Sequence, residues 1–381
     1  MNLINTGLYI HIPYCWSKCP YCDFYSVVAN NELKKKKYLS ALKNEIYLYS
    51  QKITAAKIQS IYLGGGTPTV LEGEQIVEIL DLCIKLFKIE KGIEITIECN
   101  PATLNWEKAN ILLSAGVNRL SLGAQSLSNK LLKKIGRIHN KREIINSYNI
   151  ARIAGFKNIN LDVMFGLPGQ TLKQLKGTLQ EIIELYPEHI SLYALSVEQG
   201  TPFEAIIRNG FLKIPQDDLV YEMYQKAIDL LVESGYEHYE ISNFALSGKR
   251  SLHNQIYWKN HPYLGLGASS SSYIQGRRFK NFSDVHKYTC LLEHDILPIE
   301  SKEILPLKEK MAETVILQLR MMEGLNKHDF ITRFNKPIET VFPKQLKYLQ
   351  KQELLKSNTT HYFLTKKGIF LANNVFVEFL D

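Results

Sequence analysis

The sequence predicts an α/β protein: a partial, open barrel of six β–α units, followed by a C-terminal α+β module that resembles a winged helix. Short β-rich runs alternate with long helical patterns in the first half of the chain, which favours parallel strands covered by helices. Glycine-rich turns follow several of these strands. A closed barrel of this type needs eight units, so six units favour an open one.

The predicted strands are Leu8–Ile12, Ser60–Leu63, Glu94–Glu98, Arg119–Gly123, Asn158–Met164 and His189–Ala194. The predicted helices between them lie near 34–52, 74–88, 104–115, 127–135, 141–154 and 170–185. Two turns that follow strands are rich in glycine and proline, Gly64–Pro68 and Gly166–Gly169. Because the carboxyl ends of the strands carry the active site in a barrel, we expect functional residues at these turns.

Three domains are predicted: 1–205, the barrel; 206–300, an extension of the barrel; and 301–381, the C-terminal module. The extension begins with a helix near 217–234. In the module, helices near 307–322, 327–334 and 340–355 precede a hairpin of Leu354–Ser357 with His361–Leu364. Its lysines alternate with apolar residues, and no arginine-rich recognition face is present. We therefore expect the module to dock on the barrel or gate its mouth and not to bind nucleic acid.

The composition, with 45% hydrophobic and 22% charged residues, is that of a soluble globular protein. No apolar stretch approaches the ~20 residues that span a membrane, and residues 1–8 are too short and uncharged for a signal peptide. We expect a cytoplasmic protein without disulfides. The net charge of +8 fits acidic ligands such as phosphates or propionates, or a weak peripheral contact with the inner face of the membrane.

Three cysteines, Cys15, Cys19 and Cys22, stand in one run with the spacing C-x3-C-x2-C. Three thiolates can hold a [4Fe–4S] cluster and leave one iron open for a substrate, whereas most clusters have four cysteine ligands. Zinc is the competing interpretation, but structural zinc prefers a second C-x2-C pair, which does not follow here. Pro20 and Tyr21 place the run in a loop.

The segment before these cysteines, Tyr9-Ile-His11-Ile-Pro13, makes the pattern specific. Together they resemble the opening of radical S-adenosylmethionine (SAM) enzymes, in the branch of oxygen-independent coproporphyrinogen III oxidases and HemW heme chaperones. The resemblance extends over nearly the whole chain. It implies an open barrel, a cluster held by the three cysteines, and SAM bound at the open iron through its amino and carboxylate groups.

Gly64, Gly65 and Gly66, followed by Thr67 and Pro68, stand after the second predicted strand. Glycines let the backbone approach a ligand closely, although a tight turn alone would also explain them. The motif resembles the glycine motif that contacts the SAM amino group in the family.

Polar residues mark the next strands: Glu98 ends the third, Gln125 ends the fourth, and Asp162 lies on the fifth. Such groups in a buried parallel sheet need partners, either a ligand or a structural network. Arg137 follows Gln125 by twelve residues and suits capture of a carboxylate. The resemblance gives a SAM-binding role to these four residues, to Tyr9, and to the backbone around Ala194.

A further motif, His253-Asn254-x-x-Tyr257-Trp258, lies outside the β–α units. It resembles a motif of the heme chaperones, in which the histidine would ligate heme iron while the aromatic rings pack on the porphyrin. The alternative is that these side chains only pack an interdomain core. The expected cofactors are therefore a [4Fe–4S] cluster, SAM and heme, and the expected partners are heme-accepting proteins such as respiratory enzymes.

Two departures separate the chain from the oxidases of this branch. They carry a further cysteine two residues after the third ligand, where this chain has Phe24, and an N-terminal extension, whereas eight residues precede Tyr9 here. We therefore expect a heme chaperone. The second interpretation is oxidative decarboxylation of coproporphyrinogen III to protoporphyrinogen IX. The third, a DNA-binding regulator with a sensing cluster, is suggested by the C-terminal module and opposed by the SAM-like positions.

Overall fold

A curved parallel sheet is the centre of the molecule. The computed structural model describes residues 6–380. The central strands are β1 (Thr6–Ile12), β4 (Lys57–Gly65), β5 (Lys88–Cys99), β6 (Arg119–Gln125), β7 (Ile159–Phe165) and β8 (His189–Ala194). Each is parallel to the next. They are the six predicted strands. The whole sheet runs from β14 at one edge to β9 at the other and stays open in the described part of the chain, as predicted.

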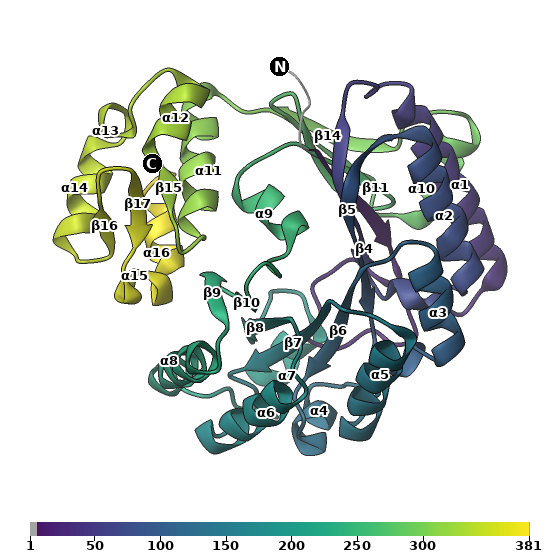
Figure 1. Cartoon of the computed structure of the whole chain (residues 1–381), viewed down its shortest axis with the longest axis horizontal. Helices are drawn as coiled ribbons and strands as arrows, with labels where there is room; N and C mark the ends of the chain where they lie inside the picture. Colours follow the sequence, from purple (N-terminus) through teal and green to yellow (C-terminus); the bar gives the residue numbers. More distant parts are fainter. Residues whose placement is uncertain (1–5, 381) are drawn as a thin grey trace.

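Helices cover the outer face of this sheet (Figure 1). They are α1 (Glu32–Ser50), α2 (Gly73–Leu86), α3 (Trp106–Ser114), α4 (Asn129–Lys134), α5 (Lys141–Ala154) and α6 (Leu172–Glu184). Short polar side chains start several of them. Asn140 accepts a hydrogen bond from the backbone of Glu143 at the start of α5, and Thr171 does the same with Gln174 at α6. α5 ends where Gly155 takes a left-handed conformation at φ 116°.

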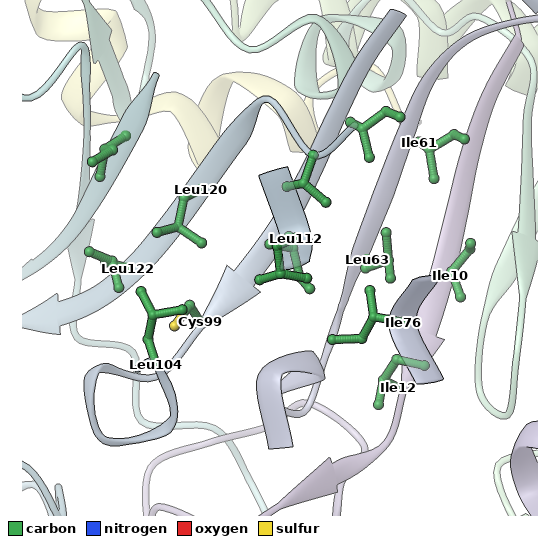
Figure 2. Packing of buried hydrophobic residues seen from close by; sticks show 14 of the residues in the cluster. Ile10, Ile12, Ile61, Leu63, Ile76, Cys99, Leu104, Leu112, Leu120 and Leu122 are labelled. Carbon is green, nitrogen blue, oxygen red and sulfur yellow. The ribbon is translucent and has the colours of Figure 1, made fainter. Parts of the chain in front are cut away.

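Alternation along the strands separates an apolar outer face from a polar inner face. On β4, Ile61 and Leu63 are fully buried and pack in the same cluster as Ile76 of α2 and Leu112 of α3 (Figure 2). The alternate residues of β4 instead reach polar partners: Ser60 contacts the His253 ring, and the Tyr62 hydroxyl donates to Glu98. The inner face of the open barrel is therefore the polar surface on which a ligand site can form.

The extension adds strands to both edges of the sheet. On one side β11 (Tyr263–Leu266) is parallel to β1 and is followed by antiparallel β12 (Ser271–Ile274), β13 (Arg277–Asn281) and β14 (Ile299–Ile304). On the other, β10 (Asn243–Ala245) and β9 (Glu237–Glu240) are antiparallel. Its helices are α7 (Pro202–Arg208), α8 (Asp217–Glu233), α9 (Leu252–Trp258) and α10 (Val285–Glu293). α8 matches the helix predicted near 217–234.

The C-terminal module has its own hydrophobic core. It contains α11 (Leu307–Leu319), α12 (Lys327–Phe334), α13 (Ile338–Val341), α14 (Pro343–Lys351), α15 (Lys366–Phe370) and α16 (Ala372–Val377), with β15 (Leu325–Asn326), β16 (Leu355–Ser357) and β17 (His361–Leu364). The hairpin of β16 and β17 is confirmed, with Leu355 opposite Leu364. The helix predicted near 340–355 is two helices, because Pro343 begins α14.

The module contacts the extension directly. The backbone N–H of Ile241 donates to Arg320 at 3.1 Å, and the Arg320 guanidinium lies 4.4 Å from the centre of the Trp258 ring. The domain boundaries at residues 205 and 300 stay a prediction. Across residues 6–380, none of the helices combines the length and the apolar character that a membrane crossing requires.

Candidate functional site

The three cysteines lie in a loop that begins at the carboxyl end of β1. The loop is closed by β2 (Tyr14–Cys15) and β3 (Val27–Val28), which pair in parallel. A turn inside it joins the backbone N–H of Cys22 to the Cys19 carbonyl at 3.1 Å. All three cysteines are free and half-buried. Burial raises the pKa of the Cys15 and Cys22 thiols, and the neighbouring cysteines add to the rise. Metal binding at this loop would therefore release protons.

The donor set of this loop fits a cluster. In residues 6–380, no group of three or more His, Cys, Asp or Glu side chains is arranged to hold a single metal ion. A four-iron cluster binds each thiolate at a different iron, so its ligands stand further apart than those of one ion. Three free thiols in one loop are the donor chemistry that such a cluster requires. Cys15 also contacts the glycine motif, with its sulfur 3.6 Å from the Thr67 hydroxyl.

The glycine motif packs against the start of the cysteine loop. The N–H of Gly66 donates to the Ile12 carbonyl at 2.9 Å, and a Cβ at Gly66 would lie 2.6 Å from the Tyr14 carbonyl oxygen. Gly65 has φ 109°, and a Cβ there would lie 2.4 Å from the His11 ring. Close packing of the loop thus requires both glycines, independently of any ligand. A Cβ at Gly64 would meet the Tyr62 ring and the Glu98 carboxyl.

Glu98 is held at the carboxyl end of β5 by two hydrogen bonds. The Tyr62 hydroxyl donates to Oε1 at 2.8 Å, and the Gly65 N–H donates to Oε2 at 3.1 Å. Burial raises the pKa of this carboxyl to about 7, and the nearby Asp162 carboxylate adds to the rise, while the two hydrogen bonds oppose it. Glu98 therefore changes charge near neutral pH, and a cationic ligand would favour its ionised form.

Asp162 on β7 belongs to a network of hydrogen-bonded polar side chains inside the open barrel. Asn160 donates to its Oδ1 at 2.8 Å, and the Ser121 hydroxyl donates to Oδ2 at 3.3 Å. The network continues through Asn160, whose amide oxygen contacts Nδ1 of His189 at 2.6 Å. Arg119, only 2% exposed, lies in the same interior, and its Nε has no hydrogen-bond partner among the described residues. Hydrogen bonds from Asn160 and Ser121 thus satisfy part of the Asp162 carboxylate, as expected if this residue belongs to a structural network.

Gln125 and Arg137 converge on Gly123. A Cβ at Gly123 would lie 3.1 Å from Gln125 Nε2 and 3.2 Å from Arg137 Nη2. Gln125 adopts φ 63°, a left-handed conformation that is strained for a residue other than glycine, at an irregularity in the β6–β7 pairing. Arg137 donates to the Gly123 carbonyl at 3.2 Å and to the Cys19 sulfur at 3.4 Å, and its Nε is buried without a partner in the described residues. It joins the cysteine loop to the strand ends.

The structure brings most of the predicted residues together at the carboxyl ends of the central strands, because these strands are neighbours and parallel. Gly64 is paired with His11, Glu98 with Ser121, and Gly123 with Asp162 in the registers of these strands. Tyr9 lies inside the barrel, with its ring 6.2 Å from that of Tyr62. Ala194 ends β8 opposite Phe165 and is exposed, at the far end of this row.

His253 lies on α9, on the inner side of the open barrel. Its side chain is 1% exposed, and both ring nitrogens have partners: Nδ1 contacts the Ser60 hydroxyl at 2.8 Å, and Nε2 contacts the Tyr257 hydroxyl at 2.9 Å. Burial lowers the pKa of its imidazole to about 3. The ring is therefore neutral, and ligation of an iron would require release from Ser60 or Tyr257.

A cavity of about 490 Å³ opens beside this motif, and we call it the junction cavity. Its walls are β1, the cysteine loop, the extension and α11, and they carry Tyr9, Phe24, Tyr257, Trp258, Tyr273 and Arg278. Tyr257 and Trp258 thus face it, whereas His253 lies behind Tyr257. Its size is within the range of small-molecule sites. Sequence reasoning missed Tyr62, Tyr273 and Arg278. Only Tyr62 had a usable signal, because it alternates with the outward-facing Ile61 and Leu63 on β4.

Known proteins resemble this chain along its whole length. Residues 9–182 match the model of the radical SAM superfamily, and residues 305–371 match the model of the HemN C-terminal domain. The heme chaperone HemW of Bacillus subtilis is 38% identical over 98% of this chain and 98% of its own length. The heme chaperone HemW of Escherichia coli is 32% identical over 100% and 99%.

A solved structure gives the same fold. Coproporphyrinogen III oxidase (HemN) from Escherichia coli, a radical SAM enzyme, has a TM-score of 0.86 and 25% sequence identity, covering 98% of this chain and 89% of that one. The resemblance inferred from the cysteine spacing and the His253 motif is thereby confirmed. The chain belongs to the radical SAM superfamily and, within it, to the family of the HemW heme chaperones.

Proposed function

We propose that this protein is a HemW-type heme chaperone, which binds a [4Fe–4S] cluster, SAM and heme and delivers the heme to acceptor proteins. The observation that carries the proposal is the full-length similarity to relatives named heme chaperone. The junction cavity supports it, because Tyr257 and Trp258 line a space of about 490 Å³ with other aromatic side chains. The acceptors that we propose are heme-requiring proteins such as respiratory enzymes.

For the cofactors, Cys15, Cys19 and Cys22 would hold the cluster. Arg137 and Glu98 would bind the carboxylate and amino groups of SAM, with Gly65, Gln125 and Asp162 beside them. A cluster with SAM at its open iron supplies one-electron chemistry. The chain itself orients the ligand. Arg137 is fixed by Gly123 and Cys19, and Glu98 is fixed by Tyr62 and Gly65, so both side chains are in place before SAM binds.

Arg137→Ala is expected to weaken SAM binding by about 2–3 kcal/mol, because a charge-assisted hydrogen bond to the carboxylate is lost. Isothermal titration of the anaerobic protein measures this change. Arg137→Lys is the matched variant: it keeps the charge but loses the planar fork, so it should recover only part of the affinity. Iron content should match the wild type in both. Unchanged SAM affinity in Arg137→Ala would remove this residue from the site.

The affinity for SAM should also depend on the ionisation of Glu98. Its carboxyl has a pKa of about 7, so it is neutral below that pH and charged above it, and only the charged form attracts an ammonium group. The ratio of SAM affinity between the wild type and Glu98→Gln should rise about tenfold from pH 6 to pH 8. Taking the ratio cancels the titration of SAM itself. A ratio that stays constant with pH would contradict the role of Glu98.

The second candidate function is oxygen-independent oxidation of coproporphyrinogen III, and the fold shared with HemN favours it. The position at which those oxidases carry a further cysteine holds Phe24 here. Phe24 is 71% exposed and lines the junction cavity, where it can supply contact area but no thiol.

Transfer of heme tests the proposed function. The heme-loaded protein is mixed with a heme-free respiratory enzyme, and heme arrival is followed by absorbance. Apomyoglobin in a parallel sample takes up only heme that has dissociated. A chaperone should load the respiratory enzyme faster than it loses heme to apomyoglobin. Equal rates in the two samples would mean that heme reaches the acceptor by dissociation alone, and the proposal would be withdrawn.

A further inference from the structure

The junction cavity has an aromatic wall that continues from the His253 motif. The Tyr257 and Tyr263 rings are 4.6 Å apart, and Tyr263 is followed by Tyr273 at 6.5 Å. Trp258 also lines the cavity, and its indole N–H is buried without a hydrogen-bond partner among the described residues. A wall of this kind can cover one face of a flat macrocycle, but it offers little to the carboxylates that such a ligand carries.

One charge in the cavity can serve those carboxylates. Of the lining side chains that the structure describes, Arg278 is the one lysine or arginine. It stands on β13 opposite Tyr273, and its guanidinium forms an ion pair with Glu313 of α11. Glu313 is 15% exposed, and its Oε2 has no hydrogen-bond partner in residues 6–380. The pair therefore joins the extension to the C-terminal module at the wall of the cavity, and Glu313 is incompletely satisfied in it.

We propose that Arg278 is the carboxylate anchor of the junction cavity, and that a propionate of the bound tetrapyrrole replaces Glu313 as its partner. The proposal rests on the heme-chaperone function proposed above and assigns this residue within it. No covalent bond changes: one carboxylate leaves the guanidinium and another takes its place.

Exchange of carboxylates explains how an anionic ligand can enter this site. A guanidinium that lacked a partner would be costly to keep partly buried, whereas a paired one is stable in both states. The planar fork of arginine also matches a propionate as well as a glutamate. When Glu313 is released from Arg278, the ion pair that joins α11 to β13 is lost. Ligand entry would thus loosen one tie between the module and the extension, which links binding to the position of the module.

A heme titration of four proteins tests the assignment. Arg278→Gln should weaken heme binding by about 10- to 100-fold, because the charge-assisted pair is lost. Glu313→Gln should tighten it several-fold, because the competing carboxylate is gone. Arg277→Gln is the matched control, since Arg277 is the neighbouring exposed residue on β13 and does not line the cavity. It should bind heme as the wild type does.

The two substitutions are expected to change heme affinity in opposite directions. This distinguishes the proposed effect from a folding defect, because a misfolded variant cannot bind heme more tightly. A second ligand, heme with both propionates esterified, should bind the wild type and Arg278→Gln equally. If Arg278→Gln binds free heme as tightly as the wild type, the anchor is wrong while the chaperone function stands. If the wild type binds no heme at all, both proposals fail.

Discussion

Replacing Cys15, Cys19 and Cys22 together with alanine is expected to lower the iron content of the anaerobically reconstituted protein from about four atoms per chain to none. The loop that carries them is anchored independently of metal. Val27 and Ala29 donate to Pro13 and Cys15 across β2 and β3, and the N–H of Phe203 donates to the Pro20 carbonyl at 3.1 Å. The triple variant should therefore fold and lose only the cluster.

Iron analysis and the absorbance of the reconstituted protein measure this result. Each single cysteine variant should also lose the cluster absorbance, because two thiolates cannot hold the cluster. Cys290→Ala is the matched control, because Cys290 is likewise free and half-buried but lies on α10. It should keep the full iron content. A triple variant that retained about four irons would show that the ligands are elsewhere.

His253→Ala is expected to lower the free energy of unfolding by about 3 kcal/mol and to weaken heme binding. The stability loss follows from the structure. The substitution removes the ring that Ser60 and Tyr257 both contact, and it leaves their hydroxyls and a cavity behind. The heme effect follows if His253 ligates the iron or holds Tyr257 against the ligand. Chemical denaturation and a heme titration in mild conditions measure the two effects.

The control separates these contributions. Ser60→Ala removes one hydrogen-bond partner of His253 without touching the junction cavity, so it should cost about 1 kcal/mol and leave heme affinity unchanged. If His253→Ala and Ser60→Ala both reduce stability while heme affinity stays at the wild-type value, the motif only packs the junction. That outcome would remove His253 from the heme site.

The fold was predictable where the physical signal is local. The six central strands and the hairpin of β16 and β17 are continuous in sequence, and each is flanked by turns or helical patterns. The extension was expected to contain β-type segments, but their bounds were not predicted, because β9 to β14 are three to six residues long and join the main sheet through two long-range pairings, β10 with β8 and β11 with β1. β11, for example, joins the sheet through Tyr263 beside Gly7, which lies more than 250 residues earlier in the chain.

The candidate site shows the same division. Cysteine spacing pointed to Cys15, and polar residues at strand ends pointed to Glu98 and Gln125, because parallel strands bring their carboxyl ends together. Contacts between side chains that are far apart in the sequence could not be predicted. That Ser60 holds His253 depends on a contact across 193 positions, and the pairing of Arg278 with Glu313 depends on how the C-terminal module docks.

The measurement that tests the central claim most directly is an anaerobic assay with the reconstituted cluster, SAM and coproporphyrinogen III, run beside a heme titration of the same preparation. A heme chaperone should bind about one heme per chain, the occupancy expected for a single cavity, and form no protoporphyrinogen IX. Robust formation of protoporphyrinogen IX together with no heme binding would contradict the account and establish the decarboxylase function instead.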